Sequence, residues 1–232
     1  MKIVTYSKVD MTAYGKISKA DVCCIHVKVL DIEGRVKKII ANISDTSWIN
    51  GIDAIDAASY AARAKKTIKK LVEEVLAGTI SMVTSELGEY IVSETAQQTL
   101  KDTCGHTLIP LAELWKERIS GNPGFDFHTE TPTRFIAFGE AKYRSNINPH
   151  TIAIEQIVTF IEDEKDIMEL ADLKHFASKE ASGNVIQEKK AFVAAFSLNG
   201  KNYKTIFDTA LTSKSIDPLL NYPEIYLVGI EI

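Results

Sequence analysis

The stretch GFDFHTETPTRFIAFGEAK at residues 124–142 constrains the fold most, because it places charges within a strongly apolar segment. Asp126 lies between two phenylalanines, and Glu140 and Lys142 end the run RFIAFGEAK. An unpaired buried charge is costly, so such groups are normally paired, bound to a metal or placed at a functional surface. The polar segment TETPT predicts a connection between two strands. A hairpin formed this way would bring Asp126 beside Glu140.

The second of these strands is predicted to be apolar along its length and charged only at its end. Glu140 and Lys142 are two residues apart, so on a strand their side chains leave the same face. Ile136 and Phe138 precede them on that face. The pattern therefore predicts a core-facing strand that ends in a charged site.

The rest of the chain predicts an α+β fold, with a mixed central β-sheet flanked by helices. No repeat or low-complexity linker interrupts it, so one compact unit is expected, with an N-terminal α+β extension at 1–80 and a core at 81–232. Strands are predicted over 22–30, 125–128, 134–143, 190–198 and 224–232, with 36–43 as the hairpin partner of the first. Helices are predicted over 53–77, 84–101, 150–164, 166–177 and 202–212, and a short amphipathic element over 109–119.

Composition excludes several classes of protein. No run of about 18 apolar residues is present, so no membrane span is expected. Three cysteines cannot complete a disulfide framework, and the N-terminus has no signal-peptide pattern, which favours the cytoplasm. The net charge of −4 argues against a generic nucleic-acid coat protein but not against a local basic patch. One candidate patch contains Lys65, Lys66, Lys69 and Lys70, with Arg63 nearby; the alternative is a solvated helix face.

Two carboxylates and an ammonium group at a strand end form a specific chemical arrangement. Carboxylate oxygens are the hard ligands that Mg²⁺ prefers, and a bound Mg²⁺ lowers the pKa of its water and neutralises charge on a phosphate. A nearby lysine can orient that water and stabilise the transition state. The alternative is a salt-bridged hairpin at the surface with no chemical role.

The order of Asp126, then Glu140-Ala141-Lys142 at the end of an apolar strand, resembles the PD-(D/E)xK nuclease superfamily, mainly over residues 84–162. The resemblance implies a restriction-endonuclease-like fold and an endonuclease that hydrolyses DNA with Mg²⁺ or Mn²⁺. Asp126 and Glu140 would be metal ligands and Lys142 catalytic. This chain has Gly124-Phe125 before the aspartate where the motif has a proline.

The superfamily also places a helix before the aspartate strand, often with a further acidic ligand. Glu89 would supply it here, with Glu86 and Glu94 as competitors. Arg144, just after the lysine, would be a phosphate contact. Gln156 and Phe160 on the following helix are similar to a QxxxY motif of RecB-like nucleases, with Phe in place of Tyr.

Across residues 55–232 the order of elements is similar to the nuclease subunit of Hachiman-type anti-phage systems. That similarity implies a role in anti-phage defence or restriction, with a helicase or other defence-system subunit as partner. Two alternatives remain open: a non-catalytic nucleic-acid-binding or assembly subunit with the same fold, and a metal-dependent nuclease acting on RNA. The metal site by itself would contact only phosphates, which DNA and RNA share.

Other groups of residues in the sequence give weaker indications of a functional site. Cys23-Cys24 with His26, and Cys104-Gly105-His106, lack the CxxC spacing of a zinc site. His128 and His150 lie near the predicted site in sequence, but each is expected to be an ordinary polar residue. No P-loop, GxGxxG or GxSxG motif is present.

Overall fold

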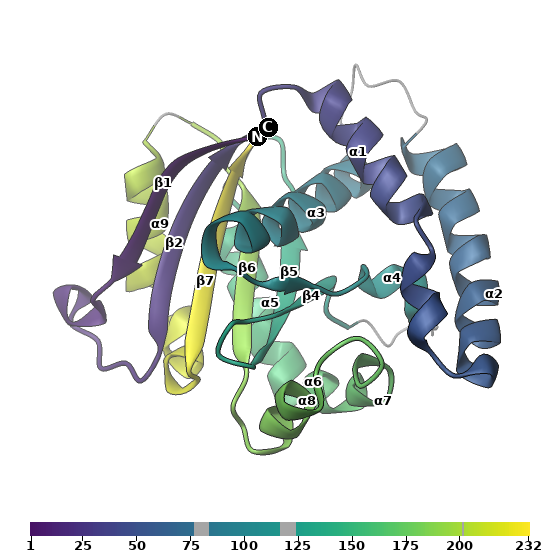
Figure 1. Ribbon diagram of the computed structural model, residues 1–232. Helices are drawn as coiled ribbons and strands as arrows, with labels where there is room; N and C mark the ends of the chain where they lie inside the picture. The colour runs from purple at the N-terminus through teal and green to yellow at the C-terminus, as the bar shows by residue number, and fades with distance from the viewer. Residues whose placement is uncertain (77–83, 117–123, 201) are drawn as a thin grey trace.

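The computed structural model describes residues 1–76, 84–116, 124–200 and 202–232. These residues contain a single seven-stranded mixed sheet in the order β1-β2-β7-β6-β5-β4-β3, with helices packed against it (Figure 1). The predicted α+β class, a mixed sheet flanked by helices, is confirmed.

Four parallel strands form the centre of the sheet: β2 (Asp21–Lys28), β7 (Glu224–Glu231), β6 (Ala191–Ser197) and β5 (Ile136–Lys142). Antiparallel strands complete its two sides: β1 (Lys2–Val9), and β4 (Phe127–Glu130) followed by β3 (Thr107–Leu108). Every residue of β6 is buried. A strand buried on both of its sides requires a layer of helix over each face of the sheet.

Two helices supply most of that cover. In Figure 1, α3 (Ser85–Cys104) crosses in front of the sheet and α5 (His150–Glu162) lies behind it. The contacts agree, since α3 packs on β4, β5, β6 and β7, while α5 packs on β5 and β6. The remaining elements are η1 (Met11–Tyr14), α1 (Ile32–Ser44), η2 (Ser47–Gly51), α2 (Ala54–Lys70), η3 (Leu71–Leu76), α4 (Ala112–Trp115), α6 (Lys165–Met168), α7 (Leu170–Leu173), α8 (Lys179–Ile186), α9 (Tyr203–Thr212) and η4 (Lys214–Asn221).

Local sequence explains where α3 begins and ends. The Thr84 hydroxyl accepts a hydrogen bond from the backbone N–H of Leu87 at 3.2 Å, which caps the first turn. Gly105 ends the helix in the left-handed region at φ 74°, a conformation that glycine adopts without steric cost. The helix is thereby fixed at both ends, and its residues keep a defined position over the sheet.

The predicted strand over 36–43 is wrong, because these residues belong to α1. Val36, Ile39 and Ile43 are buried and recur at helical spacing, and Asp31 caps the helix by accepting from the Gly34 N–H at 2.8 Å. The β-branched composition suggested a strand, but the helical period prevailed. The antiparallel partner of β2 is instead β1.

The other predicted elements are confirmed with changed bounds. The 53–77 helix is α2 followed by the π-helical turn η3, and the 166–177 helix is divided into α6 and α7. The 109–119 element is α4 alone among the described residues, while residues 117–119 and the last residue of the predicted 53–77 helix lie outside them. No sequence pattern predicted β1, β3, α8 or η4.

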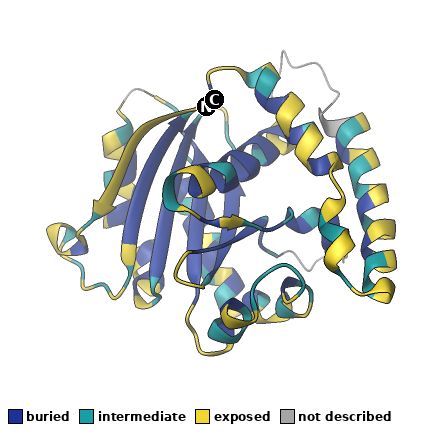
Figure 2. Cartoon of the chain, in the orientation of Figure 1, coloured by how far each residue is buried: buried dark blue, intermediate teal, exposed yellow. Residues whose placement is uncertain are grey.

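The sheet joins the two ends of the chain. β2 pairs with β7 along its whole length, so strands from the expected N-terminal extension and from the core share one sheet. Figure 2 shows β1 as the exposed outer strand beside the buried centre. In the described ranges, no helix has the length and apolarity that crossing a membrane requires.

Candidate active site

The predicted hairpin brings Asp126 and Glu140 together. In the antiparallel register of β4 and β5, the outermost pair is Phe127 and Gly139, and Asp126 and Glu140 directly flank this pair. The Asp126 N–H donates to the Gly139 carbonyl at 2.9 Å, one residue out of that register. The Asp126 side chain accepts from the Ala141 N–H, so Asp126 bonds to the peptide groups on both sides of Glu140. The two carboxyls are therefore neighbours at the end of the β4–β5 pair.

Gly139 makes this pairing compact. A Cβ atom at Gly139 would lie 2.4 Å from the ring of Phe127, so the ring occupies the space that a side chain would take. Phe127 is fully buried there. The glycine of the FGEAK segment therefore lets an aromatic ring close over the strand next to the two carboxyls.

Lys142 lies with Glu140 on one face of β5, as their spacing predicts. Its Nζ donates to Glu140 Oε1 at 2.5 Å, and the Glu140 side chain is only 2% exposed. Burial lowers the pKa of Lys142, but Glu140, Asp126 and Glu89 together outweigh burial and leave that pKa raised. Lys142 is consequently an ammonium group, and it is the cation that these three carboxylates share.

The Asp126 carboxylate is fixed by the backbone of the neighbouring strand. Its Oδ2 accepts a hydrogen bond from the Ala141 N–H at 2.8 Å. Burial raises the pKa of Asp126, while Lys142, the Ala141 N–H and Lys116 act against that rise. The backbone bond orients the carboxylate without using a second side chain.

Among the charged residues of the site, Glu140 is in the environment least favourable for an ionised side chain. Burial raises its pKa well above the usual range, Asp126 raises it further, and Lys142 opposes both. Its Oε2 atom is buried and has no hydrogen-bond donor among the described residues. The carboxyl of Asp126 interacts with that of Glu140, but two ionised carboxylates cannot hydrogen bond to one another. Oε2 thus needs either a proton or a cation.

Of the three glutamates that α3 offers, Glu89 is the one directed to the site. Its pKa is raised by burial, lowered by Lys142 and raised by Asp126, which places its carboxylate near both groups. Glu86 lies 4.0 Å from Lys70 at the rim, and Glu94 is turned away to pair with the buried Arg35 of α1. The sequence did not decide which of the three glutamates faces the site, and the packing of α3 selects Glu89.

A glycine allows α3 to approach the end of β5. A Cβ atom at Gly88 would lie 2.2 Å from the ring of Tyr143, the residue after Lys142. The ring therefore packs directly on the helix backbone. This contact holds the adjacent residue, Glu89, beside the charged end of the strand.

A cavity of about 210 Å³ adjoins the carboxylates. It is lined by Glu86, Glu89, Tyr90, Ser93, Leu111, Glu113 and Asp126. Sequence reasoning did not single out Tyr90, Ser93 or Glu113. The signal for the first two was a spacing of four residues, from Glu86 to Tyr90 and from Glu89 to Ser93, which puts each pair on one side of α3.

Of the basic residues predicted to contact nucleic acid, some lie at the rim of this cavity and others lie away from it. Lys65, Lys66, Lys69 and Lys70 are all exposed on α2, as a solvated helix face would be. Only Lys70 is tied to the rim, through Glu86. Arg144 also lies at the rim, 3.7 Å from Glu89, and donates to the Ser85 hydroxyl at 3.2 Å.

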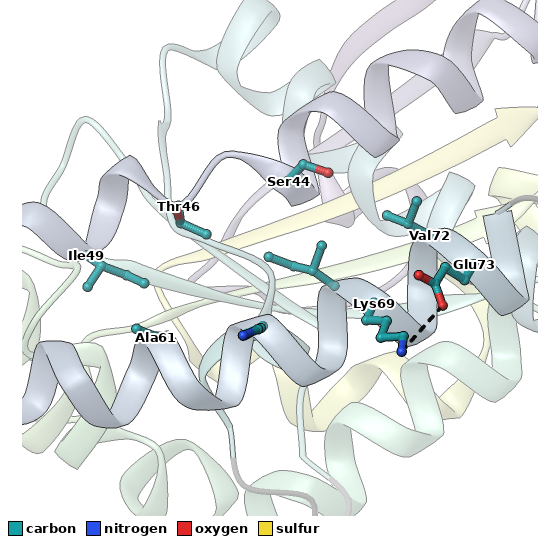
Figure 3. Close-up of a pocket in the computed structure, with 9 residues that line it drawn as sticks. Ser44, Thr46, Ile49, Ala61, Lys69, Val72 and Glu73 are labelled. Atoms are coloured by element: carbon teal, nitrogen blue, oxygen red, sulfur yellow. Dashed lines mark ion pairs between the residues drawn. The ribbon is translucent and has the colours of Figure 1, made fainter.

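Lys65 and Lys69 line a different groove, between α2 and the α1–η2 segment (Figure 3). Its volume is about 490 Å³, and Lys69 there pairs with Glu73 at 4.0 Å. None of the carboxylate-site residues lines it. The four lysines therefore do not all face the carboxylates.

The histidines and the aromatic residue of the helix motif have other roles. Phe160 is a core residue whose ring lies 5.1 Å from that of Phe125. His128 is completely buried and bonded to Glu169 at 2.6 Å, and His150 is buried against Phe196. None of these interactions is with Asp126 or Glu140.

A second group of potential ligands lies elsewhere, at the start of α2. Asp53, Asp56 and His175 each bring one ligand atom within 4.8 Å of the others, which Glu89, Asp126 and Glu140 do not do among the described residues. Asp53 is exposed and already caps α2, and Asp56 lies 3.2 Å from His175. These contacts account for the cluster without an ion.

Neither the models of known protein families nor the curated proteins include a match to this chain.

Proposed function

We propose that this protein is a Mg²⁺-dependent endonuclease of PD-(D/E)xK type that hydrolyses phosphodiester bonds in DNA. The observation that carries the proposal is that Asp126 bonds to the peptide groups on both sides of Glu140, while Glu140 pairs with Lys142 at the end of a buried strand. A surface hairpin with paired charges would not need to bury Glu140, whose burial is costly for an ionised carboxylate.

The donor set fits a magnesium or manganese ion. Glu140 Oε2 is a buried oxygen without a donor, and the neighbouring carboxylate of Asp126 supplies a second hard ligand. Asp126 and Glu140 would hold the ion, with Glu89 contributing from farther out, across the cavity. When bound, such an ion lowers the pKa of a coordinated water and neutralises charge on a phosphate.

The remaining residues of the site supply positive charge and orientation. Lys142, an ammonium group held against Glu140, can donate to a phosphate oxygen or orient the attacking water. Arg144 at the cavity rim offers a guanidinium, whose planar donors suit phosphate. DNA as the substrate class follows from the resemblance to PD-(D/E)xK nucleases, as does a role in anti-phage defence or restriction. A helicase or another defence-system subunit is the corresponding partner.

The test is cleavage of plasmid, single-stranded DNA and RNA, each with Mg²⁺, Mn²⁺ or EDTA. We expect DNA cleavage that requires the metal and is absent in Asp126→Asn and Glu140→Gln. The control is Glu86→Gln, which changes an exposed carboxyl at the same cavity and should retain cleavage. Cleavage by Glu140→Gln at the wild-type rate would exclude the mechanism, and cleavage of RNA alone would reassign the substrate.

A further inference from the structure

The residue before Asp126 is held at both of its backbone polar groups by charged side chains. The Phe125 N–H donates to Glu169 Oε1 at 3.0 Å, and Lys116 Nζ donates to the Phe125 carbonyl at 2.6 Å. Lys116 and Glu169 also form an ion pair with each other. We call these two residues the Lys116–Glu169 clamp. Lys116 follows α4, and Glu169 lies between α6 and α7, so both reach β4 from outside the sheet.

Glu169 also fixes the chain on the other side of Asp126. Its second oxygen, Oε2, lies 2.6 Å from Nε2 of His128. His128 is completely buried, and its ring lies 5.5 Å from that of Trp115. One carboxylate therefore contacts the backbone before Asp126 and the side chain two residues after it.

Gly124 provides the space in which the clamp closes. A Cβ atom there would lie 2.2 Å from Glu169 Oε1 and 2.9 Å from Lys116 Nζ. Any side chain at this position would displace one of the two charged groups. The glycine before Phe125 in the GFDF segment is thus explained by the clamp.

The clamp differs from the other buried ion pairs in what it touches. Lys190 and Asp166 form a pair in which both side chains are 2% exposed, but neither contacts the segment 124–126 or the carboxylate site. The clamp instead bonds to the peptide groups adjacent to a proposed metal ligand. Groups that orient a ligand from outside the metal shell commonly change metal affinity 10- to 100-fold when they are altered.

We propose that Lys116 and Glu169 are positioning residues that hold Asp126 in the orientation in which it shares a divalent cation with Glu140. This inference rests on the proposed function. It assigns neither residue a contact with the cation or with nucleic acid.

The experiment measures Mn²⁺ binding to the full chain by calorimetry, so that the readout does not depend on catalysis. We expect Lys116→Met and Glu169→Gln to weaken Mn²⁺ binding by about 10-fold or more. Lys116→Arg keeps a cation and N–H donors near the Phe125 carbonyl and should restore most of the affinity. The matched control is Lys190→Met, which should lower the melting temperature but leave Mn²⁺ affinity unchanged.

The outcomes separate the clamp from the proposed function. Wild-type affinity in folded Lys116→Met and Glu169→Gln would overturn the clamp and leave the nuclease proposal intact. Equal weakening in Lys190→Met would also overturn it, because the effect would then be general. If Lys116→Met does not fold, Glu169→Gln decides, because it keeps the volume of the side chain and removes only the charge that pairs with Lys116. Absence of Mn²⁺ binding in the wild-type protein would overturn both proposals.

Discussion

The buried carboxyl of Glu140 and its neighbours set the properties of the site at the scale of single residues. Asp126 repels its charge, and Lys142 compensates through a 2.5 Å contact with Oε1 only. Oε2 is left without a donor among the described residues. A group in this position favours protonation in the folded protein, and it is the oxygen that we propose binds a cation.

Glu140→Gln should therefore stabilise the protein in EDTA at neutral pH, by on the order of 1 kcal/mol. A raised pKa means that the folded state binds the proton more tightly than the unfolded state does. The stability from Glu140 is present below its usual pKa of 4.5 and is lost as pH rises through the folded pKa. Thermal melts from pH 4 to pH 8 should show the advantage of the variant appearing as pH rises.

Glu86→Gln is the control for that series, because Glu86 is exposed and its substitution removes a carboxyl without removing a buried charge. A constant difference between Glu140→Gln and wild type across the pH range would contradict the assignment of the burial cost to the charged form.

Lys142→Met should slow cleavage strongly while leaving Mn²⁺ binding in place. A protonated lysine cannot be a metal ligand, so its loss removes a catalytic group but no ligand. General acid–base groups typically contribute 10²- to 10⁴-fold to rate, and we expect a loss in that range. Single-turnover cleavage and calorimetry on the same preparation measure the two effects. A variant that cleaves normally would remove Lys142 from the mechanism.

At the scale of elements, the contact between α3 and the end of β5 is the critical one. Gly88 in α3 packs on the Tyr143 ring, and this contact keeps the helix close to the strand. The helix also carries Glu89, Tyr90 and Ser93 along the wall of the cavity. The position of one helix thus sets both the third carboxylate and the shape of the cavity.

Gly88→Ala should destabilise the protein by about 1–3 kcal/mol, the usual effect of overpacking. Its Cβ would lie 2.2 Å from the Tyr143 ring, so helix or ring must move. Gly183→Ala in α8 is the matched control, since nothing lies within 4 Å of that Cβ and alanine favours a helix by up to about 1 kcal/mol. Urea unfolding of both variants tests the contrast. Equal stabilisation of both would show that the α3–Tyr143 contact is loose.

At the scale of the whole molecule, positive charge is concentrated locally against a net charge of −4. The exposed lysines of α2 extend from Lys70, beside Glu86 at the cavity rim, to Lys65 and Lys69, which line the other groove. Figure 3 shows Lys69 in that groove. If a nucleic acid reached the carboxylate site along α2, Lys70 would be the lysine of α2 nearest to the cavity rim. Binding through phosphates depends on salt in proportion to the contacts made.

Lys66→Gln/Lys70→Gln should weaken binding of single-stranded DNA and reduce the slope of log K against log[salt] by about 0.7 per lost contact. Lys204→Gln is the control, because Lys204 is exposed on α9 and pairs with Asp208, away from the site. Fluorescence anisotropy from 50 to 200 mM salt measures the slopes. A slope unchanged from wild type would place the substrate path elsewhere.

Local sequence was sufficient to predict that Asp126, Glu140 and Lys142 lie together. The hairpin and the two-residue spacing of Glu140 and Lys142 follow from strand geometry, which depends only on near neighbours. The α+β class followed for the same reason, from apolar periodicity. The strand predicted over 36–43 failed because β-branched composition was weighed above the helical spacing of Val36, Ile39 and Ile43.

Packing between distant segments decided the rest. Sequence alone does not distinguish the three glutamates of α3, Glu86, Glu89 and Glu94. The packing of α3 against Tyr143 at Gly88 and against Arg35 decides that Glu89 faces the site, Glu86 lies at its rim and Glu94 is in a buried ion pair. Lys116 and Glu169 are 53 positions apart and meet only because α4 and the α6–α7 segment pack beside β4. Such contacts depend on the tertiary arrangement of whole elements, since their energy arises from burial and charge shared between segments that local periodicity does not relate.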